Sequence, residues 1–494
     1  LTLDPHKAGM VREFEIVSDL FTGLYAVGPD GSPVPGLAQE VVVSDDGLTW
    51  TFTLREAYWS DGVPITADDA VLGIRRFLDP STLSALAINL FMIENAAEAN
   101  AGSVPLESIG AVALDERRLR LDLVHPAHYL PDVLKQYGLP VPSHAIEAHG
   151  ESWVLPGVMV SSGAYTLSQW RSNQFVRLER NNAFFDAGNV CFDTVFYYPS
   201  SDRQAAERLV RSGEIDLNVE ISAGSLQFLE TNHSDMLRRS PGFRANDLIF
   251  NTQQPPFDDL RVRRALSMAI DRRFLADEIT RGVKQPNWRL MSPDLPGDGD
   301  HVRVDFHAEA IETRRAEARE LLIAAGYGPE NPLRVTLRIH PGFPLGGPVI
   351  QRDWAEIAPW VSADLLQNDI QLHYAAMRAG DFDVGYASWT PEYADPYSVL
   401  YLWDTSAGDL NFAGWTDAAF DALLEAARNE SDPETRLAFM SDAERLVLAS
   451  HAHAPLTVDV NFDLVQPDIT GWIANPTGRN PSRWLCREGL ESQP

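Results

Sequence analysis

The sequence is poor in cysteine and has no long hydrophobic run. Its 494 residues include two cysteines, Cys191 and Cys486, so a dense disulfide framework is excluded. Two cysteines are compatible either with one disulfide or with two buried thiols. No run of about 18 apolar residues occurs, so we expect no membrane-spanning helix and a soluble protein.

Basic residues are also scarce. There are 40 lysines and arginines against 70 aspartates and glutamates, and the formal net charge is −30. Nucleic acids and anionic lipid surfaces are bound by positive charge, so we expect neither as a partner. The negative net charge is consistent with attraction of cationic ligands, with adaptation to high salt, or with a well-solvated surface alone.

Motifs of catalysis and metal binding are missing. The sequence contains no Gly-x-Ser-x-Gly nucleophile elbow, no phosphate-binding Gly-x-x-x-x-Gly-Lys and no His-Glu-x-x-His zinc motif. His451 and His453 are close in sequence, but no third ligand stands near them, so packing or surface roles are favoured. We therefore expect no enzyme, no cofactor and no metal.

The residues that are present indicate an α/β protein of two or three domains. Thr49–Leu54 alternates apolar and polar residues as a strand does, and Thr66 precedes acidic residues as the N-cap of a helix that ends near Leu78. Such strands and helices alternate along the rest of the chain. In the second half we expect strands at 334–339 and 370–374 and helices at 354–366, 417–428 and 433–450.

A series of short motifs resembles the peptide-binding family of extracytoplasmic solute-binding proteins, solute-binding protein family 5, which serves oligopeptide, dipeptide and nickel importers. The motifs occur in the family's order from the beginning of the chain to past residue 390. They include Leu3-Asp4-Pro5-His6, Trp59-Ser60-Asp61-Gly62, Pro64-Ile65-Thr66-Ala67-Asp68-Asp69, Ser162-Gly163-Ala164-Tyr165, Arg211-Ser212-Gly213-Glu214 and Trp389-Thr390-Pro391-Glu392-Tyr393.

The resemblance implies a clamshell like that of periplasmic binding proteins, with an additional lobe. Lobe I would contain residues 1–21, 144–245 and 464–494, lobe II residues 22–143, and lobe III residues 246–463. The ligand would bind in the cleft between lobes I and II and lobe III. A short peptide is the implied ligand, and the membrane permease of an ABC importer is the implied partner.

The oligopeptide-binding branch is the closest likeness and suggests which residues touch the ligand. There, an acidic residue three positions after the tryptophan binds the terminal ammonium of the peptide, and Glu392 holds that position after Trp389. The segment around Val11 and the strand through Ala387, Ser388 and Trp389 would flank the peptide backbone. Tyr393 is a further candidate contact. Alternatively, Glu392 is an exposed loop residue and the aromatic residues belong to the core.

Some positions depart from that branch. Gly9 stands where relatives carry an acidic residue, and Leu86 where an aromatic one is expected. Of two basic residues that can meet the ligand's carboxylate, one corresponds to Tyr386, while Arg378 keeps the other. The branch's own disulfide is missing. Cys191 and Cys486 fall in one lobe, which permits a bridge between them, and such a bridge would differ from that of the branch; whether they are bridged stays open at this point.

The remaining expectations also follow from the resemblance. The chain begins at Leu1 without an apolar leader, so we expect a processed periplasmic protein, or one on the extracellular face with a lipid anchor, that acts as a monomer. Alternative ligands of the same fold are an oligosaccharide, an opine or a nickel chelate. A hydrolase or a periplasmic chaperone is the alternative from another class.

Overall fold

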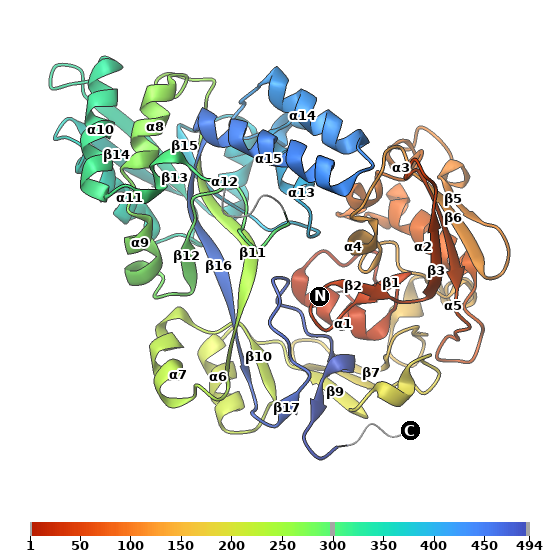
Figure 1. The fold of residues 1–494 in the computed structure, drawn as a ribbon. Coiled ribbons are helices and arrows are strands. Elements are labelled where there is room, and N and C mark those ends of the chain that lie inside the picture. The colour runs from red at the N-terminus through yellow and green to blue at the C-terminus, as the bar shows by residue number, and fades with distance from the viewer. Residues whose placement is uncertain (1, 297–301, 491–494) are drawn as a thin grey trace. The chain divides into compact units, whose positions relative to one another are not determined.

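The computed structural model describes residues 2–296 and 302–490 and contains two compact units (Figure 1). Unit 1 comprises Leu1–Ile221, Asp235–Arg238 and Asp463–Pro494, and unit 2 comprises Ser222–Ser234 and Arg239–Phe462. The outer ends predicted for lobe I, residue 1 and residues 491–494, lie outside the described residues. The division of the chain into three lobes stays a prediction.

Unit 1 combines small antiparallel sheets with short helices. Its helices are α1 (Val11–Leu20), α2 (Ala67–Leu78), α3 (Ala96–Asn100), α4 (Leu130–Leu134), α5 (Ser143–His149) and α6 (Arg203–Arg211). Its strands are β1 (Tyr25–Val27), β2 (Pro33–Pro35), β3 (Ala38–Val43), β4 (Thr49–Leu54), β5 (Ala111–Ala113), β6 (Arg118–Asp122), β7 (Tyr165–Arg171), β8 (Phe175–Arg180), β9 (Thr194–Tyr197), β10 (Leu217–Val219), β17 (Ile469–Thr470) and β18 (Cys486–Arg487).

The predicted helix start at Thr66 is confirmed, and its chemistry is that of a capping box. The Thr66 hydroxyl accepts the N–H of Asp69, whose carboxylate accepts the N–H of Thr66 at 3.0 Å. Each interaction satisfies a backbone donor that the first turn of a helix leaves unpaired. The helix ends at Leu78, as predicted, because Asp79 is extended and Pro80 follows.

A disulfide joins Cys191 to Cys486 inside unit 1, with the two Cα atoms 5.3 Å apart. The bridge closes a loop of 295 residues. Cross-linking positions so far apart in sequence restricts the unfolded chain strongly.

We expect the double substitution Cys191→Ser, Cys486→Ser to lower the free energy of unfolding of unit 1 by about 2–5 kcal/mol, because the unfolded chain regains the freedom that the bridge removes. Urea denaturation measures this change. Dithiothreitol should destabilise the wild type by a similar amount and leave the variant unaffected. Equal stability of the two proteins would contradict the prediction.

Unit 2 is built from longer elements. Its helices are α7 (Leu226–Asn232), α8 (Leu260–Met268), α9 (Arg272–Phe274), α10 (Ile311–Ala324), α11 (Gly346–Ala355), α12 (Ile370–Arg378), α13 (Tyr397–Leu400), α14 (Ala418–Asn429) and α15 (Pro433–Ser450). Its strands are β11 (Leu237–Phe250), β12 (Lys284–Pro286), β13 (Leu333–Ile339), β14 (Val361–Gln367), β15 (Val384–Trp389) and β16 (His453–Val465); β11 begins and β16 ends in unit 1.

The strands of unit 2 form a mixed sheet in the order β16–β11–β15–β13–β14, with β12 also paired to β16. β15 runs antiparallel to β11, with Ala387 opposite Asp247 and Trp389 opposite Ala245. β13 runs parallel to β14 and to β15. Strands connected by helices and paired in parallel are typical of α/β folds, so the predicted fold class is confirmed.

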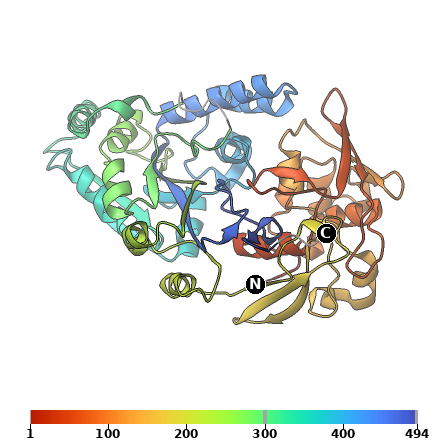
Figure 2. The same ribbon diagram turned by 60° about the horizontal axis from the view of Figure 1, so that its bottom comes forward.

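Each face of this sheet carries its own hydrophobic core. Leu248 and Phe250 of β11 pack with Trp354 and the helices α8, α10 and α11. Phe243 and Ile249, on the other face of the same strand, pack with α14 and α15. Figures 1 and 2 show the blue helices α14 and α15 standing apart from the green helices α8 and α10. The period of two along β11 therefore sends alternate side chains into two helical layers.

The sequence-based prediction was wrong at residues 354–374. Residues Val361–Gln367 form strand β14, and Ile370–Arg378 form helix α12, where we expected a helix followed by a strand. Parallel pairing with β13 overrides the helix propensity of Ala363, Leu365 and Leu366. Asp369 then caps α12 by accepting the N–H groups of Gln371 and Leu372.

Within the described residues, none of the helices combines the length and the apolar character needed to cross a bilayer.

Candidate ligand-binding site

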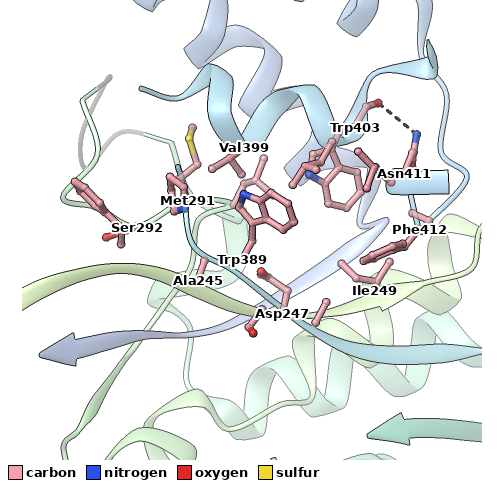
Figure 3. Close-up of a pocket in the computed structure, with 18 residues that line it drawn as sticks. Ala245, Asp247, Ile249, Met291, Ser292, Trp389, Val399, Trp403, Asn411 and Phe412 are labelled. Atoms are coloured by element: carbon pink, nitrogen blue, oxygen red, sulfur yellow. Dashed lines mark hydrogen bonds between the residues drawn. The ribbon is translucent and has the colours of Figure 1, made fainter. Parts of the chain in front are cut away.

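A pocket in unit 2 lies between one face of the sheet and the helices that follow it (Figure 3). The empty space within it is about 680 Å3, part of which is open solvent. Most of the lining is apolar or aromatic. The lining residues are Phe243, Ala245, Asp247, Ile249, Leu290, Met291, Ser292, Ala387, Ser388, Trp389, Pro391, Val399, Leu402, Trp403, Leu410, Asn411, Phe412 and Ala413.

The end of β15 borders this pocket, and beyond β13 its outer edge is contacted by α12. β13 pairs with β15 at Val384 and Gly385, and within the described residues this pairing goes no further. Beyond it, the Ser388 N–H points away from β11 and donates a 3.4 Å hydrogen bond to the hydroxyl of Tyr374. Residues 386–389 thus keep one edge paired with β11, while at the other edge His373 of α12 contacts the Tyr386 carbonyl at 2.7 Å.

Glu392 follows directly after the pocket residue Pro391. Burial raises the pKa of its carboxyl group to about 7. In the described part of the chain, no arginine, lysine or histidine forms an ion pair with it. Burial, and after it the nearby Glu392 carboxylate, raises the pKa of Tyr401. A half-buried acid without a cation is a suitable acceptor for a cationic group of a ligand.

The loop that carries Glu392 is anchored by a buried ion pair. Asp395 accepts two hydrogen bonds from Arg436 of α15, at 2.6 and 2.9 Å, and both side chains are buried. The same carboxylate accepts the N–H of Tyr397 at the start of α13. A bidentate arginine–carboxylate pair restricts orientation as well as distance, so the position of the loop is well defined.

Asp247 is a buried carboxylate in the pocket wall. It is 7% exposed, and its Oδ1 shares a 3.3 Å hydrogen bond with Nδ1 of His453. Burial raises the pKa of Asp247, while the hydrogen bond to His453 opposes this rise. His453 is itself buried and packs against the ring of Trp403. His453 thus contacts a pocket carboxylate.

The structure brings several of the predicted ligand-binding residues together. Ala387, Ser388 and Trp389 line the pocket, and Glu392 lies on the adjoining loop. The indole N–H of Trp389 donates to the carbonyl of Ser398 at 3.2 Å, so the ring has a defined orientation (Figure 3). Tyr393 is half-buried, and its carbonyl accepts the N–H of Asp395.

Two other predicted residues lie outside the pocket lining. Tyr386 is 2% exposed, its ring stacks on Phe343, and its hydroxyl donates to Oδ1 of Asn246 at 2.7 Å. Arg378 is exposed at the last position of α12. A role for either residue at the carboxylate end of a ligand stays a prediction.

Val11 belongs to unit 1 and is the exposed first residue of α1. The segment around Val11 is therefore the start of a helix. The Glu13 carboxylate fixes it by accepting the N–H groups of Gly9 and Met10 at 3.0 and 3.1 Å. A contact between Val11 and the ligand stays a prediction.

Sequence reasoning missed Asp247 and Asp395. An aspartate inside the apolar run Ala245–Phe250 was a usable signal, because a charged residue at an inward-facing strand position needs a partner. The only local sequence signal at Asp395 was the Asp-Pro pair, which begins many turns. Its ion-pair partner Arg436 is 41 residues away in the sequence and could not be inferred from it.

The sequence matches the family model of bacterial extracellular solute-binding proteins, family 5, over residues 32–411. It is 32% identical over 490 residues to the periplasmic oligopeptide-binding protein OppA of Escherichia coli K12, covering 97% of this chain and 88% of that protein. It is also 32% identical over 482 residues to the probable deoxycholate-binding periplasmic protein YgiS of the same organism, covering 96% and 89%.

A solved structure shares the fold. The murein tripeptide-binding protein MppA of Escherichia coli superposes with a TM-score of 0.81 and 30% identity, covering 98% of this chain and 96% of that one. The likeness extends over both units.

Proposed function

Because the chain belongs to family 5 of the bacterial extracellular solute-binding proteins, we propose that it captures short peptides for an ABC importer, with Glu392 binding the terminal ammonium of the peptide. The observation that carries this proposal is the half-buried Glu392 carboxylate, which has no cationic partner in the described residues and follows the end of strand β15. An ammonium group supplies both the charge and the donors that this carboxylate lacks.

The backbone of the peptide is bound as an added strand. Ser388 presents its N–H at the edge of β15 that faces α12, where the Tyr374 hydroxyl accepts it in a long hydrogen bond of 3.4 Å. An extended peptide replaces that contact and pairs with the strand through main-chain atoms, which are the same in every sequence. Affinity for many peptides then follows from backbone pairing plus the ammonium anchor.

Closure of the proposed lobes around the ligand provides the signal to the permease. A ligand shifts an open–closed equilibrium only through contacts that are stronger in the closed state. A change from 1:99 to 99:1 requires about 5.5 kcal/mol. Hydrogen bonds to charged groups contribute about 1.5–3 kcal/mol each and neutral ones about 0.5–1.5 kcal/mol, so the ammonium and a few backbone contacts suffice.

The protein is proposed to bind without turnover, in a periplasmic or other extracytoplasmic location and as a monomer. Its relatives named above are binding proteins, and OppA, MppA and YgiS are periplasmic. A lipid anchor is compatible with this role.

A second candidate is an apolar ligand other than a peptide. The aromatic pocket walls and the likeness to a probable deoxycholate-binding protein favour it. The polar lining disfavours it, because Asp247, Ser292 and Asn411 supply no cation for the carboxylate of a bile acid. An oligosaccharide, an opine or a nickel chelate gains support from no feature of this pocket.

Calorimetry with trialanine and N-acetyl-trialanine tests the anchor. We expect trialanine to bind at least about tenfold more tightly, because acetylation removes the charge and two of the donors that Glu392 would accept. Mass spectrometry of the denatured protein should also release a mixture of peptides, and added peptides should be recovered intact. Equal affinities of the two peptides, or release of a steroid or sugar instead, would contradict the proposal.

A further inference from the structure

The loop that connects helices α2 and α3 of unit 1 presents apolar side chains to solvent (Figure 1). We propose that the permease of the importer docks on this loop, through an uncharged surface that consists of Leu83, Ile88, Phe91 and Val124. The inference rests on the proposed function, because it concerns the importer for which the ligand is captured. The uncharged surface lies outside the pocket described above, which belongs to unit 2.

The loop contains a long stretch without charge. Residues 81–93 include no aspartate, glutamate, lysine, arginine or histidine, although 22% of the whole chain is charged. Burial explains part of this stretch, since Met92 and Ile93 are at most 5% exposed. It does not explain Leu83 and Ile88, which are 84% and 51% exposed. Exposed apolar side chains that gather in one place are typical of interaction sites.

Leu83 also has a backbone conformation that is unfavourable for leucine. A 3-10 turn at Pro80–Thr82 ends at Leu83, which has φ 58° and ψ 38°, in the left-handed region. Residues with a Cβ atom are strained there, and glycine is not. Packing within the chain does not offset this strain, because the side chain lies in solvent. Strain of this kind is concentrated at positions that bind a ligand or a partner.

Hydrogen bonds hold the loop in a defined shape. The Asp79 carboxylate accepts the N–H of Ser81 at 2.8 Å. The Leu86 carbonyl accepts the backbone N–H and a side-chain N–H of Asn89, at 3.0 and 3.1 Å. A loop that is ordered before it binds loses less conformational entropy on binding, so its exposed side chains contribute more to affinity.

The uncharged surface continues beyond the loop. The N–H of Phe91, a half-buried residue, donates to the Ile88 carbonyl at 3.1 Å. The N–H of Val124 donates to the carbonyl of Met92 at 2.9 Å, and Val124 is 56% exposed. Main-chain contacts therefore connect Ile88, Phe91 and Val124 into one surface.

The charges around this surface favour a protein over a lipid bilayer as its partner. Asp79 precedes the uncharged stretch, Glu94 follows it, and the net charge of the chain is −30. Anionic lipid headgroups repel such a charge, because docking on them depends on basic residues. A protein with an apolar centre and a neutral or basic rim meets no such repulsion. The permease is the protein partner that an importer provides.

Binding of the peptide-loaded protein to its ABC permease in phosphatidylcholine nanodiscs tests this surface. We expect Leu83→Gly to weaken binding at least about tenfold, because it removes a side chain that the interface would bury. The melting temperature should not fall, since glycine adopts the left-handed conformation without strain. Leu345→Ser is the matched control: it removes a leucine that is 62% exposed from the N-cap of α11, where serine is favourable, and should bind as the wild type does.

The outcomes separate this inference from the proposed function. If trialanine or the permease does not bind to the wild type, the proposed function fails and this inference with it. If both bind and Leu83→Gly binds the permease equally well, this inference alone is overturned. Val124→Ser, at the other end of the surface, should also weaken binding and provides a second test if Leu83→Gly does not fold.

Two further results would assign the surface to another partner. Binding of the wild type to nanodiscs that lack the permease would make it a lipid-binding surface. A loss of trialanine affinity in Leu83→Gly would make Leu83 a contact of the ligand. Either result would overturn the inference.

Discussion

Trialanine affinity is expected to fall as the pH drops below about 7, by up to about tenfold per pH unit, because Glu392 must lose a proton before it pairs with an ammonium. Burial raises the pKa of this carboxyl group to about 7 in the ligand-free protein. Above that pH the carboxylate is already ionised, and affinity stays level until the peptide's own amino group loses its proton near about pH 8. The optimum therefore lies between about 7 and 8.

Glu392→Gln is the matched variant, since it keeps the size of the side chain and removes its charge and titration. We expect it to bind trialanine more than about tenfold more weakly at pH 7.5 and to show no decline between pH 7 and 5. Calorimetry across that range, with thermal unfolding as a folding control, makes the comparison. A wild-type affinity that is flat from pH 5 to 7.5 would show that Glu392 does not bind the ammonium.

The second large effect is expected at Glu444, which forms a buried ion pair with Arg289. Arg289 donates to the two carboxylate oxygens at 2.8 and 3.3 Å, and the Leu290 N–H donates to one of them at 3.2 Å. The arginine and glutamate side chains are 4% and 1% exposed. The pair attaches the pocket residues Leu290 and Met291 to helix α15.

We expect Glu444→Ala to lower the free energy of unfolding of unit 2 by about 3–5 kcal/mol, because Arg289 is left buried without its counter-charge. Removing both charges together, as Arg289→Met with Glu444→Leu, should restore much of the loss. Denaturant titration measures each variant.

The same helix provides the control. Asp442 and Arg445 form an exposed pair on α15, so Asp442→Ala should cost no more than about 1 kcal/mol. Equal, small losses of unfolding free energy in Glu444→Ala and Asp442→Ala would contradict the prediction, because burial would then add nothing to the contribution of the Glu444 pair.

Elements with strong local signals were predictable from the sequence. Helix α15 spans Pro433–Ser450 as expected, because Pro433 begins it after the cap Asp432, which accepts the N–H of Thr435. Strand β4 likewise has the predicted bounds, Thr49–Leu54, since its alternating pattern matches one buried face. Strand β14 was missed because its residues favour a helix until β13 pairs with them.

The candidate site was predictable only in part. Trp389 and Glu392 stand in a contiguous motif and could be located by resemblance. Asp247 reaches the pocket through pairing with β15, about 140 residues later in the chain, and His453 comes about 200 residues after Asp247. Contacts between such distant positions have no local sequence signature, so the composition of the pocket required the structure.

Unit 1 is discontinuous in sequence, and this has a consequence for the order in which the protein can mature. The Asp19 carboxylate accepts hydrogen bonds from the Tyr197 hydroxyl and the Ser482 N–H, at 2.8 and 3.0 Å, and Cys191 is bridged to Cys486. Both sets of interactions need residues that follow all of unit 2. During synthesis, all of unit 2 is therefore made before the last segment of unit 1 exists. Unit 1 begins first in the sequence but can be completed only after unit 2.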